Sequence, residues 1–234
     1  MKSLISIVAT LLFLSLVSCS KKDESDTGKD PKSTASIATY KGVLLGSTGY
    51  FTVELGEEKS TAQLVIDHET FHIESTRPID PDEDITDYKL EKDSTFITIS
   101  VGKDRKHPQI EIVASGHPNI ITTIYEDTEE QPVENYIGWS KSENDSFYYE
   151  AGYNLSICGN QFTIIEKTTA TNQANWFSST IIGTIQRSNG NIHFNFTVDG
   201  QANSITAVEQ GDKITYFESW DNGNMQFELT KVNE

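Results

Sequence analysis

The C-terminal part of the chain, from residue 180 onward, carries the feature that constrains the fold most. Apolar and polar residues alternate there in short runs, as in IHFNFTV at 192–198. A period of two places the apolar residues on one face of a β-strand and the polar residues on the other. Asn-Gly and Asp-Gly pairs between the runs supply the positive φ angles that tight hairpin turns need. The pattern predicts a meander of five antiparallel strands, at 180–187, 192–198, 204–209, 213–219 and 225–231.

The rest of the chain shows the same strand signals and few helical ones. The runs YIGWS, DSFYYE and NQFTIIEK continue the pattern through 136–167. Further strands are predicted at 40–45, 50–55, 62–66, 71–75, 88–91, 96–101, 109–114 and 120–125. The total of about sixteen predicted strands exceeds the seven to nine strands of a single sandwich. We therefore predict an all-β protein built as an antiparallel meander or barrel.

The acidic stretch EDTEEQPVE at 126–134 divides the predicted strands into two groups. Tyr40-Lys41-Gly42 and Tyr136-Ile137-Gly138 open the two groups in a similar way. We therefore expect two tandem small β units, an N-terminal one at 39–127 and a C-terminal one at 135–234. One continuous barrel made from both is the alternative, because a closed meander would equally bury the strand edges.

The formal net charge of −17 narrows the class of partner. Nucleic-acid binding depends on Lys and Arg neutralising phosphate, so this acidity argues against a nucleic-acid partner. It equally disfavours contact with an anionic membrane surface. It favours solubility, attraction of cations or binding of basic partners.

The first residues have the composition of a secretory signal. Met1, Lys2 and Ser3 form a short basic start. The following run, ISIVATLLFLSLV at 5–17, is apolar apart from Ser6, Thr10 and Ser15. A bilayer core about 30 Å thick needs ~20 residues of helix, so this run is too short to span one. A charged start, a short apolar middle and small residues at the end are typical of a cleaved signal peptide.

Leu16-Val17-Ser18-Cys19 resembles the lipobox of bacterial lipoproteins. The resemblance implies that Cys19 receives a diacylglyceryl group, that residues 1–18 are removed, and that outer-membrane lipid is a partner. Several acyl chains anchor a protein stably where one does not. Residues 19–38 are rich in Lys, Asp, Ser, Thr and Gly, a composition that predicts a flexible tether.

The residues after Cys19 bear on localisation. Ser20 is not the aspartate that retains lipoproteins in the inner membrane, which implies an outer-membrane destination. Lys22-Asp23-Glu24 resembles the Lys-acidic tags of lipoproteins exported to the outer face. We expect the protein to face the exterior, with the periplasmic face as the alternative.

The C-terminal meander with its Asn-Gly and Asp-Gly turns resembles the lipocalin-like (calycin) barrels found among bacterial surface lipoproteins. The Gly-x-Trp motif of the first lipocalin strand is not found, since Gly138 and Trp139 are adjacent rather than spaced. The resemblance implies a ligand held in the barrel mouth.

Four aromatic residues of the C-terminal part are the candidate ligand-binding residues: Trp139, Trp176, Trp220 and Tyr216. Trp176 and Trp220 lie beside polar turns, which favours their exposure. Exposed aromatic rings with neighbouring Asp, Asn and Gln form a platform on which sugars stack and hydrogen-bond. The alternative is that these rings cap the ends of a β core.

One acidic cluster has the spacing of a calcium loop. Asp80, Asp82, Asp84 and Glu91 match positions 1, 3, 5 and 12 of an EF-hand, whose oxygens coordinate Ca²⁺. Ile85 stands where that loop needs glycine, and flanking helices are missing. We therefore expect no cofactor and no metal, with a calcium loop of another kind as the alternative. Asp67-His68 is interpreted as a hairpin turn rather than a zinc site.

Signals for catalysis are sparse. The chain has no GxSxG, HExxH or P-loop motif and no dinucleotide-binding glycine pattern. Cys158, the second of two cysteines, lies beside Ile157 and is expected to be a small buried hydrophobic residue. We predict a non-catalytic surface lipoprotein that binds a small molecule or glycan in a barrel mouth or on a β face. The alternative is a protein–protein interaction module, either an accessory subunit or an inhibitor.

Overall fold

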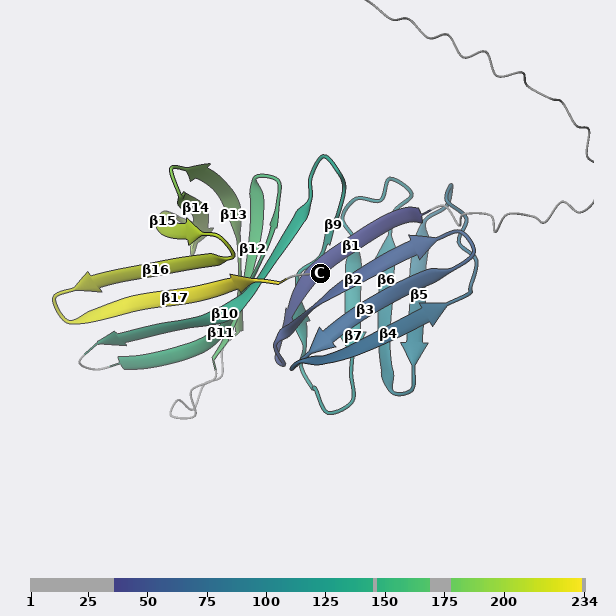
Figure 1. Ribbon diagram of the computed structural model, residues 1–234, viewed down its shortest axis with the longest axis horizontal. Coiled ribbons are helices and arrows are strands. Elements are labelled where there is room, and N and C mark those ends of the chain that lie inside the picture. The colour runs from purple at the N-terminus through teal and green to yellow at the C-terminus, as the bar shows by residue number, and fades with distance from the viewer. Residues whose placement is uncertain (1–35, 145–146, 169–177, 233–234) are drawn as a thin grey trace, which may run out of the picture. The chain divides into compact units, whose positions relative to one another are not determined.

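The computed structural model describes residues 36–144, 147–168 and 178–232 (Figure 1). These residues form seventeen β-strands and no helix, so none of their segments is a helix able to cross a membrane. All pairings between the strands are antiparallel, and one group of strands closes into a barrel. The predicted all-β antiparallel class is confirmed.

The N-terminal strands form two sheets. The first has the order β4-β3-β2-β1-β8, with β9 also paired to β1, and the second has the order β5-β6-β7. The strands of the first are β1 (Ser36–Leu45), β2 (Gly49–Gly56), β3 (Ser60–Ile66), β4 (Glu69–Ser75), β8 (Ile121–Thr122) and β9 (Tyr125–Glu126). Those of the second are β5 (Ile85–Lys92), β6 (Thr95–Val101) and β7 (Gln109–Val113). β1 begins inside the segment expected to be a tether, so residues 36–38 belong to the sheet.

The two N-terminal sheets pack face to face around one hydrophobic core. Phe51 and Leu64 of the first sheet share this core with Leu90, Ile97 and Ile99 of the second. The strands alternate buried and exposed residues because only one face of each sheet meets the core. The N-terminal unit is therefore an open sandwich rather than a second barrel.

The expected hairpin at Asp67-His68 is confirmed. Both residues have positive φ angles, 48° and 73°, and they join β3 to β4. Asp tolerates this left-handed conformation better than most residues do, which suits a two-residue turn. The single strand predicted at 120–125 is wrong, because two separate strands of two residues each, β8 and β9, occupy this region.

The C-terminal strands close into an eight-stranded barrel in sequence order. They are β10 (Val133–Asn144), β11 (Phe147–Cys158), β12 (Gln161–Thr168), β13 (Ser178–Ser188), β14 (Asn191–Val198), β15 (Gln201–Gln210), β16 (Lys213–Trp220) and β17 (Gly223–Lys231). The five strands predicted from residue 180 onward are all present, with ends within three residues of the prediction. Asn189-Gly190 and Asp199-Gly200 have positive φ at both positions, as the predicted turns require.

The alternation along each strand decides which side chains enter the barrel. Ile185, Phe194, Ala207, Ile214 and Leu229 are buried in its core. Their sequence neighbours point outward, because successive side chains of a strand lie on opposite faces. Any residue of β10–β17 can therefore be assigned to the inner or outer face from its register.

The barrel is closed unevenly. β10 and β17 pair over nine residues of β10, from Tyr136 opposite Lys231 to Asn144 opposite Gly223. β15 and β16 pair only at Val208–Gln210 and Lys213–Thr215. The other described residues of β15 and β16 are not paired with each other, so the wall is split along much of this seam.

The outer face of β11 packs on the sandwich through buried hydrogen bonds. The Asn154 side-chain amide donates to the carbonyl of Leu44 at 2.7 Å, and the hydroxyls of Thr123 and Ser156 are 2.5 Å apart. Beside them, Val43, Leu45 and Ile165 form a small apolar cluster. Because these polar groups are buried, they specify one docking position for β1 on the barrel.

Glycine at 138 allows β10 to approach β17 closely. A Cβ placed on Gly138 would lie 1.9 Å from the carbonyl oxygen of Glu228, which belongs to the backbone of β17. We predict that Gly138→Ala lowers the free energy of unfolding by about 2–4 kcal/mol, because the backbone must move to admit the methyl group. Urea denaturation measures this loss. The control Gly102→Ala, whose Cβ would lie 3.1 Å from a side-chain oxygen of Asp104, should lose less than about 1 kcal/mol. Equal losses in the two variants would contradict the close-approach argument.

Candidate ligand-binding site

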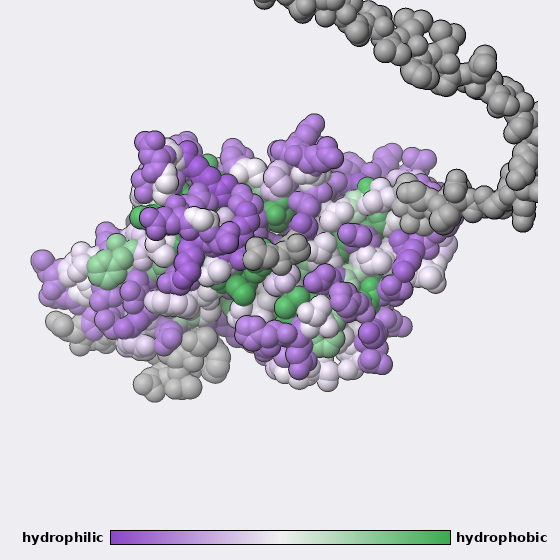
Figure 2. Space-filling view, viewed as in Figure 1, coloured by the Kyte–Doolittle hydropathy of each residue, from purple (hydrophilic) through white to green (hydrophobic). Residues whose placement is uncertain are grey.

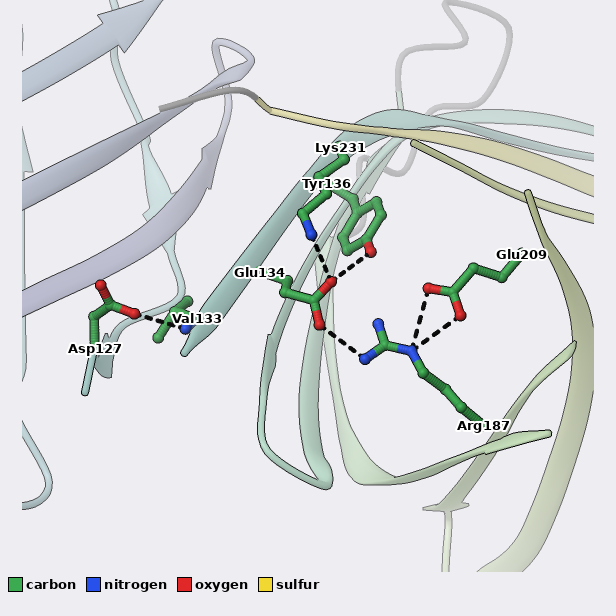
Figure 3. Close-up of polar contacts among 7 residues, drawn as sticks. All are labelled: Asp127, Val133, Glu134, Tyr136, Arg187, Glu209 and Lys231. Carbon is green, nitrogen blue, oxygen red and sulfur yellow. Dashed lines mark hydrogen bonds and ion pairs between the residues drawn. The ribbon is translucent and has the colours of Figure 1, made fainter. Parts of the chain in front are cut away.

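One end of the barrel is closed by an ionic network (Figure 3). Glu134 accepts hydrogen bonds from Lys231 Nζ at 2.8 Å, Arg187 Nη1 at 2.8 Å and the Tyr136 hydroxyl at 2.9 Å. Arg187 Nε also donates to Glu209 at 3.0 Å. Each of these charged residues lies two positions along its strand from a residue of the barrel core. The side chains therefore converge on the lumen and plug this end.

The network stabilises the charged form of Glu134. Burial alone would raise the pKa of this carboxyl group, but the hydrogen bonds from Lys231 and Arg187 outweigh burial and lower the pKa to about 2. Two carboxylates and two cations balance each other in this plug. It has no excess charge to offer a ligand, and its role is structural.

The outer wall of the barrel carries a groove of about 370 Å³. It lies where β15 separates from β16, and its lining includes Trp139, Val208, Thr215, Phe217, Gln226 and Glu228. Cross-strand pairing places Trp139, Glu228, Thr215 and Val208 in one row over β10, β17, β16 and β15. The next row contains Gln226 opposite Phe217. Residues paired in this way point to the same side of a sheet.

The groove has aromatic walls and a polar floor. The side chains of Phe217 and Trp139 are 66% and 40% exposed, which is high for rings of this size. Between them lie Gln226 and Glu228 of β17, and Glu228 accepts a hydrogen bond from Lys213 Nζ at 2.6 Å. The arrangement combines flat apolar faces with hydrogen-bonding groups about one strand spacing away, ~4.8 Å.

The predicted aromatic residues lie on both faces of the barrel wall. Trp139 is on the outer face, whereas Tyr216, which also borders the groove, is on the inward face of β16 and stacks on Phe227 with ring centroids 5.2 Å apart. The Tyr216 hydroxyl donates to Glu218. Trp220 lies on the face of β16 that carries Tyr216, where its Nε1 would be 2.8 Å from a Cβ on Gly223. Trp176 and Cys19 lie outside the described residues.

Phe217 was not among the predicted site residues, although the sequence contains a signal for it. In KITYFES, Ile214 and Tyr216 occupy the inward positions of β16. Phe217 is an aromatic residue at a position where the alternation calls for a polar one. An apolar residue out of phase with its strand marks an exposed apolar side chain.

The acidic cluster at 80–91 is arranged around backbone groups. Asp80 accepts the Asp82 N–H at 2.9 Å, and Asp84 accepts the Lys103 N–H at 2.8 Å. The Arg105 guanidinium donates to the carbonyls of Pro81 at 2.6 Å and Glu83 at 3.3 Å. Glu91 pairs with Lys89 on β5. Within the described ranges, no group of three or more His, Cys, Asp or Glu side chains is arranged to hold a metal ion.

Cys158 is a free thiol that is half-buried rather than fully buried as expected. Its Sγ lies 3.8 Å from the carbonyl oxygen of Gln131. Burial, followed by the charges of Asp127 and Glu126, raises the pKa of this thiol. The thiol therefore stays protonated and is a weak nucleophile.

No model of a known protein family, no curated protein and no solved structure matches this chain. Assignment of a function therefore depends on the geometry of the described residues. The outer groove is a candidate because it joins exposed aromatic rings to polar groups in one concave surface.

The plug predicts a specific dependence of stability on pH. The pKa of Glu134 is about 2 in the folded chain and 4.5 for the ordinary side chain. A pKa lowered by folding stabilises the protein above pH 4.5 and loses this contribution as the pH falls toward 2. We expect the wild type to lose about 2 kcal/mol more than Glu134→Gln between pH 6 and pH 3, measured by urea denaturation. Glu111→Gln, an exposed position on β7, should follow the wild type. Parallel pH curves for the wild type and Glu134→Gln would refute this assignment.

Proposed function

We propose that this protein is a non-catalytic, lipid-anchored protein of the outer membrane that binds a glycan in the outer groove of its barrel. The observation that carries the proposal is the pair of exposed rings, Trp139 and Phe217, on either side of a polar floor. Exposed aromatic side chains of this size are uncommon without a binding role when they line a concave surface together.

The geometry suits a sugar. The apolar C–H face of a pyranose ring stacks on an aromatic face, while its hydroxyl groups need hydrogen-bond partners. Gln226, Glu228 and Thr215 offer such partners on the floor between the rings. Trp139 on β10 and Phe217 on β16 are separated by two strand spacings, about 10 Å, and by two residues along the strands, about 7 Å. This separation is on the scale of a disaccharide unit, so each ring would contact a different sugar residue.

The distribution of apolar surface favours a glycan over a protein partner. The face of the molecule in Figure 2 is mainly hydrophilic, and its apolar areas are small and separate. Protein–protein sites usually present a larger contiguous apolar patch. In the outer groove, polar side chains likewise separate the two rings. An accessory subunit or inhibitor is therefore the second candidate, to be distinguished by the same binding experiment.

The membrane anchor in this proposal is Cys19. Leu16-Val17-Ser18-Cys19 ends an apolar run too short to span a bilayer, which is where a lipobox lies. The chain between Cys19 and β1 would hold the folded part away from the lipid surface. The net charge of −17 would oppose contact with anionic lipid.

Glycan binding in the outer groove predicts that the wild type binds oligosaccharides and that variants of the two aromatic rings bind them more weakly. On a glycan array, the lipidated protein in a non-glycosidic detergent should bind a defined set of oligosaccharides. Trp139→Ala and Phe217→Ala should each weaken that binding at least about tenfold, since each removes a stacking surface worth ~1.4 kcal/mol or more. Ile182→Ala is the control, because Ile182 on the outer wall of β13 is also 66% exposed. Unchanged glycan binding in the two aromatic variants would refute the groove, and co-purification of a protein lost in those variants would favour the second candidate.

The anchor is tested independently of the ligand. Cells fed an alkyne-tagged palmitate should incorporate the tag into the wild-type protein, and Cys19→Ala should carry no tag and leave the outer-membrane fraction. Cys158→Ala is the control for the second thiol and should retain the tag. Labelling that persists in Cys19→Ala would overturn the lipid attachment.

A further inference from the structure

A buried carboxylate points into the barrel near the end opposite the ionic plug. Glu166 is only 9% exposed and lies on β12 in phase with Phe162 and Ile164 of the barrel core. Burying a carboxylate is costly unless its charge is compensated. The hydrogen-bonding and charged groups around Glu166 therefore show whether its negative charge is compensated.

Three hydroxyl groups hold the Glu166 carboxylate. Tyr149 and Ser140 donate to one of its oxygens, the latter at 3.3 Å, and Ser179 donates to the other at 2.9 Å. In the part of the chain that the structure describes, no lysine, arginine or histidine nitrogen forms an ion pair with Glu166. Glu134 at the other end has two cationic partners. The cradle at Glu166 thus fixes the position of a negative charge without neutralising it.

Tyr153 supplies a second, independent feature at the same place. It lies directly opposite Glu166 in the pairing of β11 with β12, and its side chain is 2% exposed. Among the described residues, its hydroxyl has no hydrogen-bond partner. No fully buried side-chain nitrogen or oxygen of the described chain lacks a partner. The Tyr153 oxygen is therefore not completely buried, and it lies on the inward face of β11.

An aromatic wall continues from this point. The rings of Tyr153 and Phe227 have centroids 5.3 Å apart at 30°, and those of Phe227 and Tyr216 are 5.2 Å apart at 21°. The faces of such rings carry partial negative charge and attract cations. Glu218, two residues beyond Tyr216, adds a further negative charge on the same face of β16.

We propose that this end of the barrel binds a small organic cation, a primary amine that carries an aromatic or aliphatic group. The ammonium group would donate one hydrogen bond to Glu166 and another to the free oxygen of Tyr153. The hydrocarbon part would pack on Phe227 and Tyr216. A neutral or anionic ligand of the same shape would leave the carboxylate uncompensated and is therefore discriminated against. Glu166 and Tyr153 do not line the glycan groove, whereas Tyr216 and Phe227 border it as well. Variants at Glu166 and Tyr153 therefore test the amine site separately from the glycan groove.

The first test uses 2-phenylethylamine, which is protonated at pH 7, and 2-phenylethanol, its neutral analogue. Isothermal titration calorimetry of the full-length lipidated protein should show saturable binding of one amine per chain. The alcohol should bind roughly tenfold more weakly or worse, because it cannot neutralise Glu166. Equal affinity for the two compounds, or no saturable binding of the amine, would overturn the proposal.

Variants then locate the site. Glu166→Gln is nearly isosteric, keeps a hydrogen-bond acceptor for the cradle, and should lower amine affinity roughly tenfold or more. Glu150→Gln removes the same charge from the outer face of the neighbouring strand β11 and should leave affinity unchanged. Equal losses in the two variants would mean that the net charge attracts the amine, which contradicts a specific site.

A third variant keeps the test decisive if Glu166→Gln does not fold. Tyr153→Phe removes only the free hydroxyl and keeps the aromatic stack, so its melting temperature should match the wild type. Its amine affinity should fall several-fold while its affinity for 2-phenylethanol changes less, because the hydroxyl is proposed to accept from the ammonium group. Unchanged amine affinity in Tyr153→Phe would refute the assignment of Tyr153 as part of the site.

Discussion

The pairing of β17 with β10 is the constraint on which the rest of the barrel depends. It joins strands from the two ends of the C-terminal unit over nine residues of β10 and converts a meander into a closed wall. Once the register is set, a shift by one residue would move every inward side chain outward. Gly138 is part of this constraint, because its missing side chain lets β10 approach the backbone of β17. Closure therefore assigns Ser140 and Phe227 to the lumen and Trp139 and Glu228 to the outer wall.

The two ends of the lumen differ in electrostatics although both contain a carboxylate. Glu134 is held by Arg187 and Lys231, so its charge is neutralised and that end is filled. Glu166 is held by hydroxyl groups, which position the carboxylate but supply no opposite charge. The same residue type thus stabilises the fold at one end and presents a binding group at the other. The outer groove is a third environment, where exposed rings and polar groups alternate across neighbouring strands.

Local patterns predicted much of this architecture. The Asn189-Gly190 and Asp199-Gly200 turns and the alternation in 192–198 set the hairpins and faces of β13–β15, because both signals act between near neighbours. Trp139 is a predicted ligand-binding residue because of its aromatic type. The placement of Trp139 and Phe217 in one groove could not be predicted, because β10 and β16 come together only by pairing on either side of β17. Tyr216, chosen with Trp139, points to the opposite side of the wall.

By itself the sequence determined that the described chain is all-β and which residues of each predicted C-terminal strand face a core. It also contains Leu16-Val17-Ser18-Cys19, which resembles a lipobox and from which the anchor is proposed. Only the tertiary structure decided which strands close a barrel and which form an open sandwich. It alone brought Lys231 to Glu134 across 97 residues and Ser140 to Glu166 across 26. The physical reason is that turns and alternation are properties of adjacent residues, whereas compensation of a buried charge depends on side chains that approach one another only after the wall has closed.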